Sequence, residues 1–306
     1  MNRFRIIALL PLAAMLSACD AVVLNPSGDI AVQQRDIVVI STALMLLVIV
    51  PVMVLTVLFA WRYRQSNTAA RYEPDWNHSM QLELVIWGGP LLIVACLGAL
   101  TWMATHLLDP YRPIGRVAAG QQVAQEVRPL EVDVVSLDWK WLFIYPDQRV
   151  ATVNALTVPV GAPLQFELTS SSVMNVFFIP QLGSMIYTMN GMVTHLNLRA
   201  DQEGDLQGLS AHFSGDGFPA MLFDVHVISA LDFPNWVATT AKSNNVLSAD
   251  AYKQLAQQSI ETGRPTYRLD DPTLFRQIST QQIPPGPGPQ LTDNIAKPAS
   301  GAANVR

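Results

Sequence analysis

The side chains that most often ligate metals or act as nucleophiles are few in this chain of 306 residues. Its two cysteines, Cys19 and Cys96, are too few for a disulfide framework or for a cysteine-rich metal or iron–sulfur site. The five histidines include no closely spaced pair of the kind that binds a metal. The histidines are His78, His106, His195, His212 and His226. The chemistry of the chain therefore depends on single residues and on the elements that hold them.

One carboxylate, Glu83, directly precedes a run of 22 uncharged residues, 84–105. A carboxylate at a membrane boundary can collect protons from water and pass them into a buried channel. It can also be a solvated acid at the start of a helix, where the helix dipole stabilises its charge. From the residues alone the second interpretation is favoured.

The N-terminus has the pattern of an exported, lipidated protein. Arg3 and Arg5 precede an apolar run, residues 6–16, which at 11 residues is too short to span a bilayer. The sequence Leu-Ser-Ala-Cys that ends at Cys19 resembles a bacterial lipobox. We therefore expect a signal peptide over residues 1–18 and a lipid on Cys19. The alternative is an ordinary signal peptide followed by an incidental cysteine.

Two later apolar stretches are long enough to cross a bilayer as helices. Residues 37–61 and 84–105 contain 25 and 22 residues without a charge, and about 20 suffice for 30 Å of hydrocarbon. We expect transmembrane helices over residues 37–61 and 84–108. With an exported N-terminus, residues 19–36 lie outside, the loop 62–83 is cytoplasmic, and the chain after residue 108 lies outside again.

The overall composition agrees with a membrane-anchored protein. Charged residues make up 14% of the chain, below the roughly 25% of soluble domains. Hydrophobic residues make up 50% and the mean hydropathy is +0.25. The net charge of −5, without a basic block, argues against a nucleic-acid partner.

Residues 109–231 have the pattern of an all-β domain. Leu130, Val132 and Val134 alternate with acidic residues, as is typical of a strand with one buried face. Similar short stretches are separated by glycine and proline turns, which favours a β-sandwich or barrel.

The chain after residue 231 changes character again. Residues 232–283 form a C-terminal extension, in which a helix is predicted from Ser248, as N-cap, to about residue 260. The segment 284–306 opens with a run of proline and glycine, and we expect it to be disordered.

A signal peptide, a two-helix hairpin and an exported β-domain together resemble subunit II of the haem–copper respiratory oxidases. Glu-Leu-Val-Ile-Trp-Gly-Gly-Pro at 83–90 is similar to the motif that opens its second helix. Asp-Trp-Lys-Trp-Leu-Phe-Ile-Tyr-Pro at 138–146 is similar to the aromatic strand of its cupredoxin-like domain. The resemblance extends from about residue 19 to 275. It implies a membrane-anchored α+β fold, in which a transmembrane hairpin is followed by an exported cupredoxin-like antiparallel β-sandwich and a short helical extension.

Cytochrome c oxidases of this family hold a dinuclear copper centre on one histidine and a Cys-x-x-x-Cys-x-x-x-His-x-x-Met segment, whose two soft thiolates are essential. The ligand positions of that centre fall here on Asn175, Ser210, His212, Ser214 and Phe218, with Met221 retained. One thioether with hydroxyl groups and a phenyl ring cannot hold two copper ions. We therefore expect no metal site in this chain.

The loss of copper is typical of the quinol-oxidase branch, and the chain resembles subunit II of a bacterial cytochrome bo-type ubiquinol oxidase. The resemblance implies a complex that oxidises ubiquinol, reduces oxygen to water and pumps protons. It places the haems and one copper in subunit I and none in this chain, which is expected to be non-catalytic. It also favours the first interpretation of Glu83, as the mouth of a proton path into subunit I.

The resemblance also predicts partners and location. The partners are subunit I, the smaller membrane subunits and the lipid bilayer, without cytochrome c. The location is the bacterial inner membrane, with the main domain in the periplasm. Two alternatives remain, a copper-carrying cytochrome c oxidase subunit II and a free-standing membrane lipoprotein with a cupredoxin-like binding module. The missing thiols argue against the first of these.

Overall fold

The computed structural model describes residues 22–71, 73–114, 116–118, 121–122, 128–261 and 263–289. The predicted signal peptide, Cys19 and the segment 290–306 lie outside the described residues. The chain forms two compact units. One is helical and consists of residues 32–109; the other combines the β-domain with the segment that precedes residue 32.

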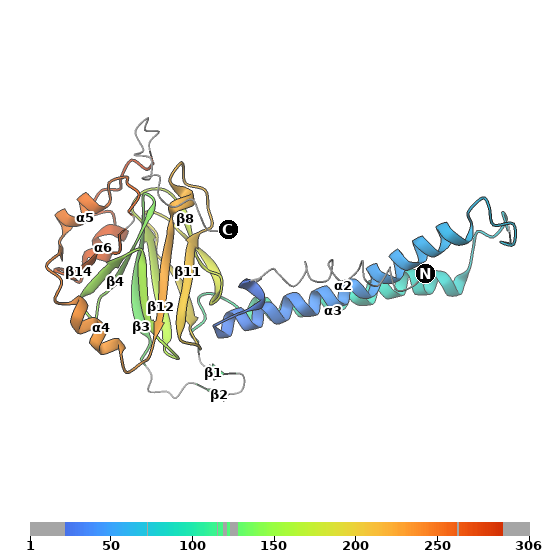
Figure 1. Cartoon of the computed structure of the whole chain (residues 1–306), viewed down its shortest axis with the longest axis horizontal. Helices are drawn as coiled ribbons and strands as arrows, with labels where there is room; N and C mark the ends of the chain where they lie inside the picture. The colour runs from blue at the N-terminus through green and yellow to red at the C-terminus, as the bar shows by residue number, and fades with distance from the viewer. Residues whose placement is uncertain are drawn as a thin grey trace, which may run out of the picture. The chain divides into compact units, whose positions relative to one another are not determined.

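Two long helices make up the helical unit (Figure 1), α2 (Asp29–Arg62) and α3 (Met80–Leu107). Both are long and apolar enough to cross a membrane, and they contain the predicted spans almost entirely. Each includes a proline, Pro51 or Pro90. Helices satisfy their backbone hydrogen bonds internally, which is what hydrocarbon requires. Their apolar side chains are largely exposed in the chain by itself, as expected of surfaces covered by lipid or by other membrane subunits.

The β-domain is a sandwich of two sheets, seen in Figure 1. One sheet has seven strands in the order β10-β7-β3-β4-β5-β14-β13, and the other has five in the order β6-β12-β11-β8-β9. The strands of the first sheet are β3 (Leu130–Leu137), β4 (Lys140–Tyr145), β5 (Val150–Val153), β7 (Pro163–Ser170), β10 (Thr194–Arg199), β13 (Val246–Leu247) and β14 (Thr266–Leu269). Those of the second are β6 (Ala155–Pro159), β8 (Asn175–Ile179), β9 (Gly183–Thr188), β11 (Gly204–Ser210) and β12 (Leu222–Ile228).

The predicted sandwich is confirmed, and its strand pairing is mixed. Most neighbouring strands are antiparallel, but β3 pairs with β7, β6 with β12 and β13 with β14 in parallel. The first two parallel pairs arise because the chain crosses to the other sheet before it returns, as in Greek-key connections, whereas β13 and β14 are joined through the helix between them. A separate small ribbon is formed by β1 (Arg116–Ala118) and β2 (Gln121–Gln122).

Aromatic side chains fill the space between the two sheets. Trp141 and Phe143 come from one sheet, and Phe177 and Phe223 from the other. All four are fully buried, and the rings of Phe177 and Phe223 stack with centroids 5.2 Å apart. Trp141 meets both of these phenylalanines edge-on. Large rings in such arrangements contribute most of the burial that holds two sheets together.

Most of the C-terminal extension covers the outer face of the seven-stranded sheet, whereas its first helix packs against the core between the sheets through Phe233 and Trp236. The extension contains α4 (Phe233–Thr240), α5 (Ala249–Leu255) and α6 (Leu274–Ser279), and it adds β13 and β14 to the seven-stranded sheet. A second apolar core joins Val135 and Ile144 of the sheet to Tyr252 and Phe275 of the extension. The extension is therefore part of the same folded unit as the sandwich.

The predicted helix of the extension is α5, and its cap is the expected one. Ser248 Oγ accepts a hydrogen bond from Ala251 N at 3.2 Å. The helix ends at Leu255, earlier than predicted. The reason is that Gln257 O and Ser259 Oγ accept hydrogen bonds from Lys140 Nζ, at 2.8 and 2.6 Å, and these tertiary contacts replace further helical turns.

Candidate functional site

The structure brings together two of the positions that the resemblance assigns to lost copper ligands. Asn175 begins β8 and Ser210 ends β11, and both side chains are buried. Ser210 Oγ donates to Asn175 Oδ1 at 3.3 Å. Asn175 Nδ2 donates to Ser136 Oγ at 3.4 Å, and Thr188 Oγ1 donates to the same hydroxyl at 2.9 Å. A network of amide and hydroxyl groups therefore occupies this end of the sandwich.

The other positions lie in the following loop. Ser214 Oγ lies 4.0 Å from Met221 Sδ. Phe218 begins a 3-10 turn, Phe218–Ala220, and packs edge-on against Phe213. His212 lies edge-on to Tyr187, with ring centroids 6.3 Å apart.

These donors do not fit a dinuclear copper centre. The residues at the end of the sandwich offer hydroxyl, amide and thioether groups with the single imidazole of His212, and the hydroxyl and amide groups are already engaged with one another. Soft copper ions require thiolate or imidazole ligands. Among the described residues no group of three or more histidine, cysteine, aspartate or glutamate side chains could hold a metal ion.

Trp139 holds the loop in place by direct packing. Its indole Nε1 donates to Ser214 O at 3.0 Å. A Cβ at Gly217 would lie 2.1 Å from Cδ2 of this indole, so only glycine fits against the ring. Trp139 itself has φ +69°, which is unusual for a bulky residue and marks a site that the surrounding structure constrains.

A shallow groove of about 330 Å³ lies beside this loop. Its lining consists of Val173, Met174, His212, Phe213, Ser214, Gly215 and Pro289. Gly286 N donates to Ser171 O at 2.9 Å, so the described beginning of the expected tail is positioned by the sandwich. The last described residue, Pro289, lies at the edge of the groove.

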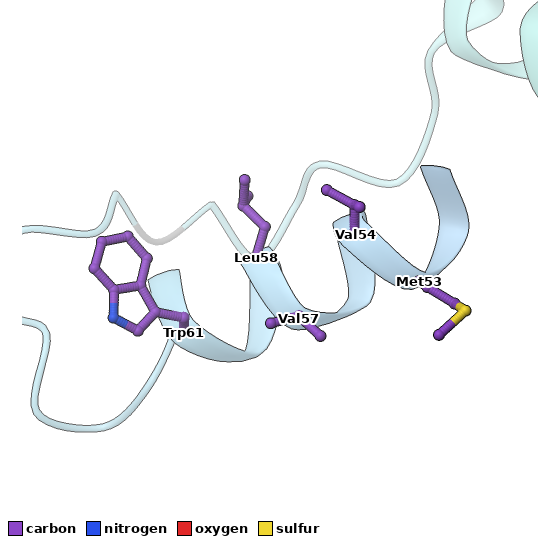
Figure 2. A pocket seen from close by; sticks show the side chains of 5 residues that line it. All are labelled: Met53, Val54, Val57, Leu58 and Trp61. Carbon is purple, nitrogen blue, oxygen red and sulfur yellow. The ribbon is translucent and has the colours of Figure 1, made fainter. Parts of the chain in front are cut away.

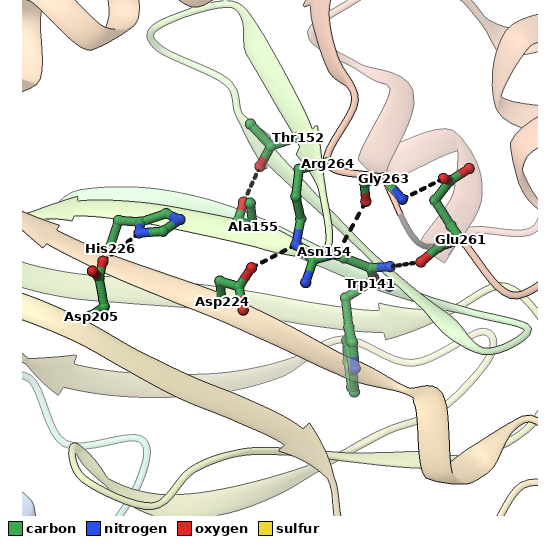
Figure 3. A network of polar contacts seen from close by, with 10 residues as sticks. All are labelled: Trp141, Thr152, Asn154, Ala155, Asp205, Asp224, His226, Glu261, Gly263 and Arg264. Atoms are coloured by element: carbon green, nitrogen blue, oxygen red, sulfur yellow. Dashed lines mark hydrogen bonds and ion pairs between the residues drawn. The ribbon is translucent and has the colours of Figure 1, made fainter. Parts of the chain in front are cut away.

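A polar network joins the extension to the sandwich (Figure 3). Asn154 Oδ1 accepts from Trp141 N at 2.8 Å, and Asn154 Nδ2 donates to Glu261 O at 3.1 Å. Arg264 Nε donates to Asp224 Oδ2 at 2.7 Å. These contacts hold Glu261 to the corner between β5 and β6 and Arg264 to β12 of the five-stranded sheet.

Lys140 is a buried cation in the same region. Burial lowers its pKa to about 8, and the nearby Glu261 and Asp138 oppose this shift. Its ammonium group donates to the extension, as described above. Asp138 accepts a hydrogen bond from Ser172 Oγ, while burial raises its pKa. We assign Lys140 to the attachment of the extension, because it donates to Gln257 and Ser259, whereas Asp138 is held within the sandwich by Ser172.

Glu83 lies in the first turn of α3, one turn after Ser79, whose carbonyl accepts from Glu83 N at 2.9 Å. Its Oε1 lies 2.6 Å from His78 Nδ1, and both side chains are about half exposed. The sequence interpretation missed His78 as a partner. A carboxylate paired with an imidazole at a membrane boundary can exchange protons with water, and the same position also benefits from the helix dipole.

A second hollow, of about 510 Å³, lies on α2 alone. It is lined by Met53, Val54, Val57, Leu58 and Trp61 (Figure 2). Its lining is almost entirely apolar, so it offers shape but no catalytic group.

No protein-family model matches the chain. Among curated proteins it is 47% identical over 270 residues to cytochrome bo(3) ubiquinol oxidase subunit 2 of Pseudomonas aeruginosa, which covers 88% of this chain and 78% of that protein. It is 46% identical over 247 residues to ubiquinol oxidase subunit 2 of Acetobacter aceti, which covers 81% and 78%. Among solved structures it matches the periplasmic domain of subunit II of cytochrome oxidase of Bradyrhizobium japonicum, with 21% identity and a TM-score of 0.35, over 36% of this chain and 91% of that one.

Proposed function

Because the chain belongs to the subunit 2 family of the ubiquinol oxidases, we propose that it is the non-catalytic subunit II of a proton-translocating complex. That complex oxidises ubiquinol and reduces oxygen to water. The hydrogen bond between Ser210 and Asn175 is the observation that best supports a β-domain without a copper relay. The side chains at two former ligand positions form a hydrogen bond with each other there, and neither position carries a thiolate.

Without a copper relay, electrons from ubiquinol do not pass through the β-domain in this scheme. We place the haems and the remaining copper in subunit I, together with the site where ubiquinol is oxidised. Cytochrome c has no role in this scheme, because a water-soluble donor would need a metal relay in this chain. The copper-carrying alternative requires ligands that the site lacks.

The role of this chain is to brace subunit I from the membrane and from the exported side. The helices α2 and α3 supply apolar surface for partner subunits and lipid. The chain is docked on the sandwich just before α2 and at its first turn, where Ser27 N donates to Gln181 O at 2.8 Å and Ala31 N donates to Leu182 O at 3.2 Å. A lipid on Cys19 would add a third attachment to the inner membrane, with the sandwich in the periplasm.

Complementation tests the proposal. In membranes that lack this chain, ubiquinol-dependent oxygen uptake is expected to be lost, and the full-length chain should restore it. The variant Met221→Leu should restore it equally well, because the retained thioether ligates no copper. Loss of activity in a fully assembled Met221→Leu complex would contradict the copper-free assignment.

Glu83→Gln is expected to slow proton uptake and ubiquinol-dependent turnover by about tenfold. This is less than the roughly 10²–10⁴-fold effect of a positioned acid or base, because water and His78 still deliver protons to the same entrance. The measurement is proton uptake by the complex in proteoliposomes. The matched control is Glu73→Gln, an acid of the same loop paired with Arg71, which should leave both rates unchanged. Unchanged rates in Glu83→Gln would exclude the proton-entry role.

A further inference from the structure

A row of polar side chains crosses the outer face of the seven-stranded sheet. Asp133 of β3 lies opposite Glu167 of β7, and Glu167 lies opposite His195 of β10. Side chains alternate along strands, so these three share a face, while their neighbours Val132 and Phe166 point into the core. Neighbouring strands are about 4.8 Å apart. The three residues, here called the polar row, therefore form a continuous line.

The outer end of the polar row meets the segment that follows α3. His195 Nδ1 lies 3.7 Å from Glu167 Oε1, and the ring of Tyr111 stands edge-on to His195 at 5.5 Å. Asn197, two residues further along β10, donates to Pro110 O through its backbone and side-chain nitrogens at 3.0 and 3.1 Å. Pro110 follows the end of α3 by three residues. The row thus ends at Pro110 and Tyr111, the first residues of the β-domain unit after α3.

The inner end of the polar row is a buried acid that lacks a hydrogen-bond partner among the described residues. Asp133 is 8% exposed, whereas the side chains of Glu167 and His195 are 40% and 37% exposed. Its flanking charges are Glu131 on the same strand and Glu167 on the next, and both are negative. On the other side, β4 presents the apolar Ile144.

Within the described part of the chain, no lysine or arginine forms an ion pair with this acid. The helix α6 packs over this sheet, and its Arg276 interacts electrostatically with Asp271, not with Asp133. An ionised carboxylate that is buried beside two further carboxylates is costly, and binding a proton removes that cost. Burial, followed by Glu167 and Glu131, accordingly raises the pKa of Asp133 to about 8.

We propose that the polar row is a proton-binding site of the exported domain. Asp133 takes up one proton, as a carboxylate becoming a carboxylic acid, and exchanges it with the external water through Glu167 and His195. The proposal rests on the proposed function, because a proton-translocating oxidase delivers protons to this side of the membrane. A proton store in the exported domain would receive them before their release.

Infrared spectroscopy of the purified full-length chain tests the proton-binding step. At pH 7 the wild-type chain is expected to show the carbonyl stretch of a protonated carboxylic acid. This band should be absent in Asp133→Asn. In the wild type it should disappear as the pH is raised, with a midpoint near pH 8. The matched control is Asp205→Asn, an exposed aspartate whose Oδ1 lies 2.6 Å from His226 Nδ1, and it should retain the band. A spectrum unchanged by Asp133→Asn would overturn the proposal.

Proton release by the complex in proteoliposomes tests the role of the store. After a pulse of oxygen, an impermeant pH dye should report a release delay that Asp133→Asn shortens by about twofold or more, and that Asp205→Asn does not alter. An identical delay in Asp133→Asn would exclude a store on the release path. If no complex formed, the proposed function would fail, while the infrared band would still decide whether Asp133 binds a proton.

Discussion

Phe177→Ala is expected to lower the free energy of unfolding of the β-domain by about 3–5 kcal/mol, the usual cost of removing a buried phenyl ring. Phe177 is fully buried and lies against the rings of Trp141, Phe143, Phe166 and Phe223. Because rings from both sheets surround it, the cavity left behind could close only if the sheets moved. Urea unfolding of the full-length chain in detergent, followed by tryptophan fluorescence, measures the loss.

The matched control is Phe213→Ala. Phe213 is 70% exposed, and a surface substitution of this kind is expected to change stability by no more than about 0.5 kcal/mol. Equal effects of the two substitutions would show that Phe177 is not the centre of the core.

Asp133→Asn is expected to stabilise the folded chain by about 5 kcal/mol at pH 9 and by only about 1.5 kcal/mol at pH 5, which lies about one unit above the unfolded pKa. The folded state holds the pKa of Asp133 at about 8, while an unfolded aspartate has a pKa of about 3.9. Between these values the folded state binds more protons, so wild-type stability falls as pH rises through this window. Each pKa unit corresponds to about 1.36 kcal/mol, and asparagine avoids the loss because it stays neutral.

Unfolding curves at the two pH values measure this effect, with Asp205→Asn as control. Asp205 is largely exposed, so its substitution should change stability by about 0.5 kcal/mol or less at both pH values. If the wild type became more stable relative to Asp133→Asn between pH 5 and pH 9, this would contradict the assignment of Asp133 as the buried acid.

Local patterns in the sequence were sufficient for the fold class. Uncharged runs located both long helices, and the alternation of Leu130, Val132 and Val134 identified a strand that buries these residues in the core. The cap at Ser248 was also found, because a hydroxyl before a helix is a local signal. The copper interpretation needed only residue types, since no thiol follows Cys96.

Features that depend on distant parts of the chain were not predictable in this way. The alternation suggested that Asp133 faces solvent, yet Asp133 is buried on the face that the extension also covers. Lys140 is likewise buried by residues more than a hundred positions later in the chain. The pairing of Asn175 with Ser210 follows from the register of β8 and β11, which no local pattern encodes. Trp139 adopts a left-handed backbone that only its packing explains.

The central claim is that this chain works as the copper-free subunit II of a ubiquinol oxidase. The most direct test is affinity purification of the tagged full-length chain from its native membrane in mild detergent, with a haem spectrum and oxygen-uptake assays on the same fraction. We predict that haem copurifies with the chain, that ubiquinol drives oxygen uptake, and that reduced cytochrome c does not. A chain that migrates alone and without haem would contradict the claim.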